Sequence, residues 1–328
     1  MDDLMFTLNA ILPILIPIFL GYLLSRLKFF SGDFLAKCNK FVFTIFIPIL
    51  LFKNLYKADL SQIQFDFLLF AVLGVFGLFL VGLIVVKLFI PEPKQKGVVL
   101  QALFRSNYAI IGIPLAEKLG DLNAPILAAV IAAATVPLFN ILAVISLSIY
   151  SDDSASKPSV KSILKKIITN PLIIGVACGL LVNFMSMGID ALGGNMNAFY
   201  SVASFIPSTI NSLAGIATPL MLVILGARFE FKAVSKLWRQ LTLSVSLRLL
   251  VTPLVMLTLA YLIGFRTNNY FATLIALFAT PIAVSSVPMA AQMNADEELA
   301  GQIVVWTSFL SMFTLFVIII ICRLIGLL

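Results

Sequence analysis

Apolar stretches long enough to cross a bilayer recur along the whole chain, and this pattern restricts the fold more than any other feature. Hydrophobic residues make up 61% of the 328 residues and charged residues only 11%, against roughly 25% charged in a soluble domain. A soluble fold of this length could not cover so much apolar surface. Stretches of about 20 apolar residues cross membranes as helices, so we predict an all-α, multi-pass protein of the cell (plasma) membrane.

Hydropathy places about ten spans along the chain. They lie near residues 5–25, 36–53, 66–90, 97–118, 123–150, 170–188, 203–226, 240–264, 270–293 and 299–326. We predict a first five-helix repeat over residues 1–150, a polar cytoplasmic linker over 151–169, and a second five-helix repeat over 170–328. Because five is an odd number, the second repeat would enter the membrane upside down relative to the first, as in an inverted repeat.

The fourth and ninth spans resemble two copies of one broken helix. Residues 100–116 and 274–290 align with a single offset of 174 positions, which places Asn107 opposite Pro281. Both segments are apolar enough for a bilayer, yet both carry polar residues and helix breakers in the middle. Backbone groups freed at a break must be satisfied by protein or by water in a cavity, and paired breaks indicate a transporter's binding site. The expected helix breakers are Gly112, Pro114, Pro281 and Pro288.

The distribution of basic residues predicts the orientation of the chain. With the N-terminus outside, fifteen of the 22 Lys and Arg residues fall in inner loops. Basic residues concentrate in short cytoplasmic loops, so we expect both termini to lie outside. The same requirement explains the net charge of +7, and we expect no nucleic-acid partner.

The residue content excludes several kinds of chemistry. There is no His, which rules out His-based proton relays and His-ligated metals. Three distant cysteines suggest no disulfide framework, and the sequence holds no nucleotide-binding loop, metal-ligand cluster or paired carboxylates in mid-span. We therefore expect no enzyme, no cofactor and no metal site.

Polar residues in the middle of spans are the candidate substrate contacts, because intramembrane polar groups tend to be functional. Asn107 offers two donors and an acceptor, which suits a carboxylate; alternatively, it satisfies backbone freed at the break. Arg105 could bind a carboxylate in bidentate fashion, or could reach the inner interface or pair with an acid. The other candidates are Ser106, Tyr108, Asn140, Ser285, Ser286 and Gln292. Ordinary helix packing is the alternative for the serines.

Each break also creates a second half-helix. Its N-terminus presents free N–H groups and the positive end of the helix dipole. Two such ends meeting at mid-membrane would attract an anion, so the expected substrate is a small organic anion.

The motif around Asn107 resembles a known family. Residues 106–115, Ser-Asn-Tyr-Ala-Ile-Ile-Gly-Ile-Pro-Leu, are similar to the fourth-helix motif of the auxin efflux carrier family, whose plant PIN members carry Pro-Asn followed by Gly-Ile-Pro-Leu. Residues 287–288 and 294–298 resemble the ninth helix and the turn after it. The resemblance extends over essentially the whole chain in the number and order of spans.

The resemblance implies a fold shared with bile-acid sodium symporters, in which spans 1, 2, 6 and 7 form a scaffold and the remaining spans form a transport unit. It implies that spans 4 and 9 cross, that Asn107 touches the substrate carboxylate, and that Pro281 marks the second crossing. A homodimer through the scaffold helices is compatible with it. Bacterial members are associated with malate, malonate and similar acids. Ser106 replaces a proline of the plant members and Arg105 adds a charge, which favours a more strongly anionic substrate than auxin.

We predict a secondary transporter of small organic anions, either malate-like or malonate-like carboxylates or auxin-like acids, that works by elevator-type alternating access. Coupling to protons or sodium stays open. One alternative is a sodium-coupled symporter of the bile-acid type, which would want acidic or amide sodium ligands near the crossing. Another is a membrane receptor or scaffold without flux, which an uptake assay would distinguish from both carriers.

Overall fold

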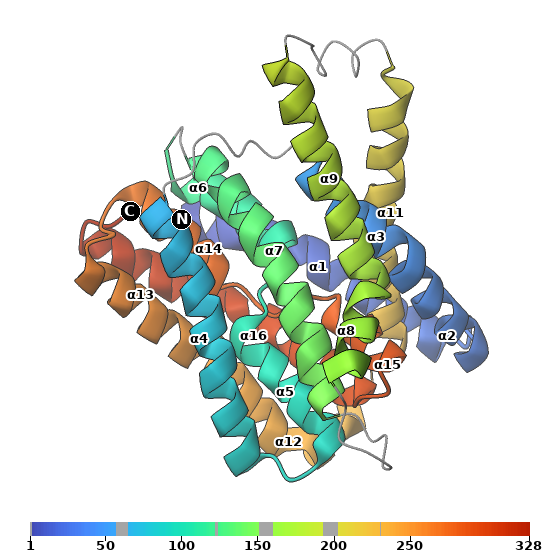
Figure 1. Cartoon of the computed structure of the whole chain (residues 1–328). Helices are drawn as coiled ribbons and strands as arrows, with labels where there is room; N and C mark the ends of the chain where they lie inside the picture. The colour runs from blue at the N-terminus through green and yellow to red at the C-terminus, as the bar shows by residue number, and fades with distance from the viewer. Residues whose placement is uncertain (1, 57–64, 122–123, 151–159, 193–202, 230) are drawn as a thin grey trace.

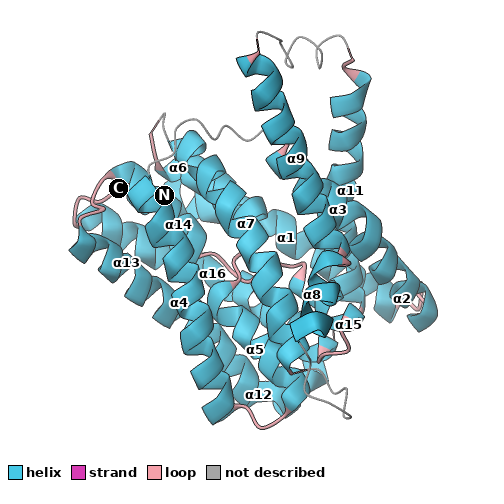
Figure 2. Ribbon diagram, viewed as in Figure 1, coloured by secondary structure: helices cyan, strands magenta, loops and turns pink. Residues whose placement is uncertain are grey.

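The protein, represented by a computed structural model, is described at residues 2–56, 65–121, 124–150, 160–192, 203–229 and 231–328, and all regular elements in these ranges are helices (Figure 2). The helices are α1 (Asp2–Arg26), α2 (Gly32–Phe41), η1 (Val42–Phe46), α3 (Ile47–Leu55), α4 (Phe65–Phe89), α5 (Pro93–Phe104), η2 (Tyr108–Gly112), α6 (Ile113–Leu119), α7 (Ala124–Ile149), α8 (Val160–Ile168), α9 (Pro171–Ala191), α11 (Phe205–Ala227), α12 (Phe231–Ser246), η3 (Leu247–Val251), α13 (Thr252–Ile263), α14 (Asn268–Phe278), α15 (Ser286–Gln292) and α16 (Glu297–Leu324). The elements η1, η2 and η3 are single π-helical turns.

Seven helical segments within the described residues are long and apolar enough to cross a membrane. They cover residues 32–55, 65–89, 127–149, 171–190, 205–227, 234–263 and 297–324. The other three predicted spans correspond to α1 and to two segments divided by a break, α5–η2–α6 and α14–α15. The predicted all-α membrane class is confirmed, and the inverted five-helix repeat stays a prediction.

Each π turn is followed by a helix whose second residue is proline. Pro48 follows η1, Pro114 follows η2 and Pro253 follows η3. In each case the residue before the proline donates its N–H to the carbonyl five positions earlier. A proline ring clashes with the carbonyl four residues before it, and the wider π turn relieves that crowding. The helices therefore pass these prolines without breaking.

The helices pack in two groups that also contact each other, since α1 packs against α16. In one group α1 packs against α11, and α3 packs against both α9 and α11. In the other, α4, α5 and α7 pack together, α14 packs against α6 and α13, and α16 packs against α12 and α15. Helices α9 and α11 extend beyond the rest of the molecule at the top of Figure 1. The backbones of α1 and α11 are close enough that a Cβ atom on Gly226 would lie 1.8 Å from the Ile18 carbonyl oxygen, so this contact requires glycine.

Candidate functional site

The two broken segments meet at their breaks. Helix α5 ends before residues 105–107, which are not helical, and α14 ends before a longer non-helical stretch at 279–285. The two stretches run antiparallel and pair through a single β-bridge between Ser106 and Ile282. Each break therefore supplies the other with a backbone partner.

One backbone bond of this bridge and one contact between side chains hold the breaks together. The Asn107 N–H donates to the Pro281 carbonyl at 2.8 Å, and the hydroxyl oxygens of Ser106 and Thr280 lie 2.7 Å apart. All four residues belong to the interrupted parts of the chain. These contacts satisfy groups that would otherwise be without partners inside a membrane, where no lipid atom could replace them.

The predicted helix breakers take two kinds of position. Pro281 lies within the second break, whereas Gly112, Pro114 and Pro288 lie in helical residues beyond the breaks. Pro114 follows the π turn described above. Pro288 is the third residue of α15, where a missing N–H removes no helical bond, because the first N–H groups of a helix have no intrahelical partner. Only Pro281 of these four residues is therefore part of an interruption.

Arg105 lies at the first break and is buried, with 1% of its surface exposed. Its guanidinium donates to Gln101 Oε1 at 2.7 Å, Asn140 Oδ1 at 3.1 Å and Ser285 Oγ at 2.9 Å, and Nη1 lies 3.2 Å from Met289 Sδ. All four partners are neutral, and within the described residues no carboxylate pairs with this arginine. A buried charge is unfavourable unless it is paired, so this guanidinium offers a strong site for an anion.

Asn107 adds a donor without a partner. The side chain is 3% exposed, and its Nδ2 atom has no hydrogen-bond partner in the described part of the protein. It lines a cavity of about 50 Å³ together with Arg105, Ser106, Asn140 and Ser285. Leaving a buried donor unsatisfied costs about 1–3 kcal/mol, so a ligand that accepts from this amide would stabilise the site.

The cavity lies where the two helix groups meet. Its apolar wall includes Ile47, Leu50 and Leu51 from α3 and Met221 from α11, whereas its polar groups come from the breaks and from α7. Gln101 was not among the predicted site residues, although it lies one helical turn before Arg105 and binds it. A polar residue four positions before Arg105 lies on the same helix face, and this spacing is the signal that could have identified Gln101.

Three predicted site residues lie outside this cavity. Tyr108 donates its hydroxyl to the Ala128 carbonyl at 3.1 Å, so it links η2 to α7. Ser286 is buried in the first turn of α15 and does not line the cavity. Gln292 ends α15 and is exposed.

The expected free N–H groups at the start of α15 are already bonded. The Ser286 N–H donates to the Ala283 carbonyl at 3.0 Å, and the Val287 N–H donates to the Val284 carbonyl at 3.2 Å. The tight turn that leads into α15 brings these carbonyls within reach. The charge of Arg105, rather than the end of α15, is therefore the main attraction for an anion here.

A larger cavity of about 580 Å³ lies between α13 and α16. Its wall is mostly apolar, with Leu254, Leu257, Phe313 and Val317 among its residues, and no charged side chain lines it. Volume alone would favour this cavity, but it offers an organic acid no counter-charge. We therefore assign the candidate site to the smaller cavity at the breaks.

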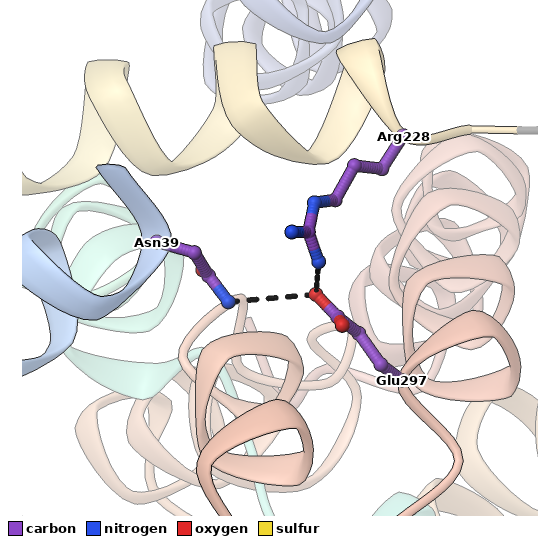
Figure 3. Close-up of polar contacts among 3 residues, drawn as sticks. All are labelled: Asn39, Arg228 and Glu297. Carbon is purple, nitrogen blue, oxygen red and sulfur yellow. Dashed lines mark hydrogen bonds and ion pairs between the residues drawn. The ribbon is translucent and has the colours of Figure 1, made fainter. Parts of the chain in front are cut away.

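A separate polar contact joins the two helix groups. Glu297 at the start of α16 forms an ion pair with Arg228, which caps the end of α11. Asn39 of α2 donates its Nδ2 hydrogen to the same Glu297 oxygen at 3.4 Å (Figure 3). Both side chains of the ion pair are a little over a quarter exposed. Glu297 therefore joins α16 to α11 through an ion pair and to α2 through a hydrogen bond (Figure 3).

Comparison with known proteins identifies the family. A model of the family described as membrane transport protein matches residues 6–319. A protein of Methanothermobacter thermautotrophicus named "uncharacterized transporter" is 24% identical over 311 residues, which cover 94% of this chain and 95% of that protein. A Rhizobium meliloti protein named "putative malonate transporter" is 24% identical over 314 residues, which cover 93% and 92%. The chain therefore belongs to the membrane transport protein family, the auxin efflux carrier family of multi-pass transporters whose fourth-helix motif it resembles.

Proposed function

We propose that this transporter carries small organic acids with one or two carboxylates, and that they bind at the crossing of the two breaks. The observation that supports this proposal most strongly is a buried arginine with only neutral partners beside an amide donor without a partner. A carboxylate would take the place of the Asn140 and Ser285 oxygens on Arg105 and would accept from Asn107. Planar carboxylates match the fork of a guanidinium.

The size of the cavity favours a small substrate. Its volume of about 50 Å³ is far below the ~300 Å³ at which ligand pockets usually begin. A three-carbon or four-carbon dicarboxylate needs less widening than an indole acid. The name of the Rhizobium meliloti relative refers to malonate, and malonate is accordingly the first substrate to test.

The proposed mechanism is alternating access by an elevator-type movement, with the two helix groups as the moving parts. The group of α1, α2, α3, α9 and α11 would be the scaffold, and the other helices would carry the crossing. The cavity wall supports this division, since α3 and α11 form one side and the breaks form the other. Two inverted five-helix repeats, outward-facing termini and a dimer through the scaffold belong to the same proposal.

Binding and flux are tested separately. Malonate should raise the unfolding temperature of the purified protein, because a ligand that binds only the folded state stabilises it, by ~2.7 kcal/mol at one hundred times Kd. Asn107→Ala should weaken malonate binding by about 1–3 kcal/mol, since a buried carboxylate oxygen loses its donor. Leu50→Ala is a control in the apolar wall.

Uptake of labelled malonate into proteoliposomes then distinguishes a carrier from a receptor that only binds. Binding without uptake would contradict transport of malonate. If malonate, malate and acetate are neither bound nor taken up, the proposed substrate class is contradicted.

A further inference from the structure

Arg248 of η3 is a second buried arginine, and its exposed fraction is 0%. Unlike Arg105, it donates only to backbone carbonyls among the described residues. Its Nε, Nη1 and Nη2 atoms donate to Thr280 at 2.7 Å, to Leu103 at 3.3 Å and to Leu277 at 3.2 Å. One guanidinium therefore contacts the ends of both first half-helices, α5 and α14.

These carbonyls need a partner because of the breaks themselves. In an uninterrupted helix the Leu103 carbonyl would accept from residue 107, but the Asn107 N–H donates to Pro281. The Leu277 carbonyl would accept from residue 281, which is a proline without an N–H. Both helix ends also carry the negative end of a dipole. Two negative ends therefore converge next to a cavity proposed to hold an anion.

We propose that Arg248 is a tethered cation that neutralises this carbonyl cluster, and so takes the place that a coupling sodium ion occupies in carriers where half-helix ends bind sodium. Carbonyls of unwound backbone and of half-helix C-termini coordinate cations in many secondary transporters. Here the guanidinium occupies those carbonyls, and an arginine is always charged in proteins. Anion binding at Arg105 should therefore need no sodium.

The same contacts make Arg248 a positioning residue. The Thr280 carbonyl precedes Pro281, whose own carbonyl accepts from Asn107, and the Leu103 carbonyl lies two residues before Arg105. Holding these carbonyls fixes the register of the two breaks, and with it the geometry of the proposed acid site. The positioning role of Arg248 rests on the proposed function, whereas its neutralisation of the carbonyls does not.

Four variants separate charge from hydrogen bonding. Arg248→Lys keeps the charge, Arg248→Gln keeps polar donors without charge, and Arg248→Ala removes both. Arg266→Ala is the matched control, because Arg266 is exposed and donates to one backbone carbonyl, that of Tyr261 at 3.0 Å. Each protein is tested for thermal unfolding and malonate uptake, in sodium or choline, with or without millimolar guanidinium.

We expect wild-type uptake to be the same in sodium and in choline. Arg248→Ala should lose about 10- to 100-fold in uptake, as for other groups that orient a ligand-binding residue. Guanidinium should raise the unfolding temperature and uptake of Arg248→Ala and leave Arg266→Ala unchanged. The unfolding temperature and the malonate uptake of Arg248→Lys should both be higher than those of Arg248→Gln.

A wild-type requirement for sodium would overturn the inference, as would equal behaviour of Arg248→Lys and Arg248→Gln. If Arg248→Ala does not fold, the comparison of Arg248→Lys with Arg248→Gln tests the inference instead. If the wild type takes up no carboxylate, the proposed function fails, but guanidinium-dependent stabilisation of Arg248→Ala still supports the tethered cation. Absence of that stabilisation in a folded Arg248→Ala protein would refute it.

Discussion

Arg105 and Arg248 are equally buried, but their partners differ. Arg105 donates to the side chains of Gln101, Asn140 and Ser285, which can turn away and give up their place to a ligand. Arg248 donates to three backbone carbonyls that no rotation of a side chain can remove. Burial alone therefore does not separate a binding arginine from a structural one. The type of partner does, and the following experiments test that distinction.

The largest effect should come from replacing Arg248. Arg248→Met leaves the Thr280 and Leu277 carbonyls without their donor, whereas the Leu103 carbonyl keeps a bond from the Thr252 hydroxyl at 3.4 Å. Each unsatisfied group costs about 1–3 kcal/mol, so we expect the free energy of unfolding to fall by about 2 kcal/mol or more. The matched variant Arg105→Met removes a buried charge without an ionic partner and should change stability by less than ~1 kcal/mol or increase it. Equal destabilisation in thermal unfolding would break the comparison.

Ligand binding should show the opposite order. Arg105→Gln should weaken malonate binding by about 1.5–3 kcal/mol, the range for hydrogen bonds to charged groups, with a smaller loss for acetate. Calorimetric titration of the purified variant measures both affinities. Similar losses for the two acids, with wild-type expression, would indicate a structural role for Arg105.

Replacing Pro281 tests how the break and Arg248 depend on each other. Pro281→Ala supplies an N–H that can bond the Leu277 carbonyl, so it competes with Arg248 and favours a straighter helix. Uptake should fall by about tenfold, as for other positioning groups, with little change in unfolding temperature. Pro288→Ala is the control, because Pro288 lies in the first turn of α15. Equal effects of the two substitutions on uptake would show that the break itself is unimportant.

The smallest effect should come from breaking the ion pair between Arg228 and Glu297. Arg228→Gln removes a partly exposed pair, and such pairs contribute about 0–1 kcal/mol. Stability should therefore change little and malonate affinity should not change. The uptake rate should rise, because Arg228 links α11 to α16 across the two helix groups. Asn39→Ala removes only the weaker contact to Glu297 and should raise the rate less. A change in malonate affinity would contradict this placement.

The sequence predicted the membrane class, the seven membrane-spanning segments of the described residues, and the presence of breaks in the fourth and ninth predicted spans. Polar residues and prolines in apolar segments sufficed for this, because lipid cannot satisfy freed backbone. Arg105, Asn107 and Pro281 were identified for the same reason, and Asn140 and Ser285 join Arg105 and Asn107 at the cavity.

Other features depend on which segments pack together. The sequence could not show that Gly112 and Pro114 lie in continuous helix, since the π turn before Pro114 forms in its three-dimensional setting. Nor could it show that Tyr108 turns toward α7. Arg248 was visible as a charge within a span, but its role depends on three carbonyls supplied by two other segments of the chain.

The three π turns have a consequence for side-chain phase. Each contains one residue more than an α-helical turn, so every later side chain is rotated by roughly 100° relative to an uninterrupted α-helix. A helical wheel drawn with 3.6 residues per turn would therefore assign the wrong face to the residues beyond Pro48, Pro114 and Pro253. Deleting one residue from such a turn should rotate the following half of the span by roughly the same angle, which turns some core-facing residues toward lipid and some lipid-facing residues toward the core.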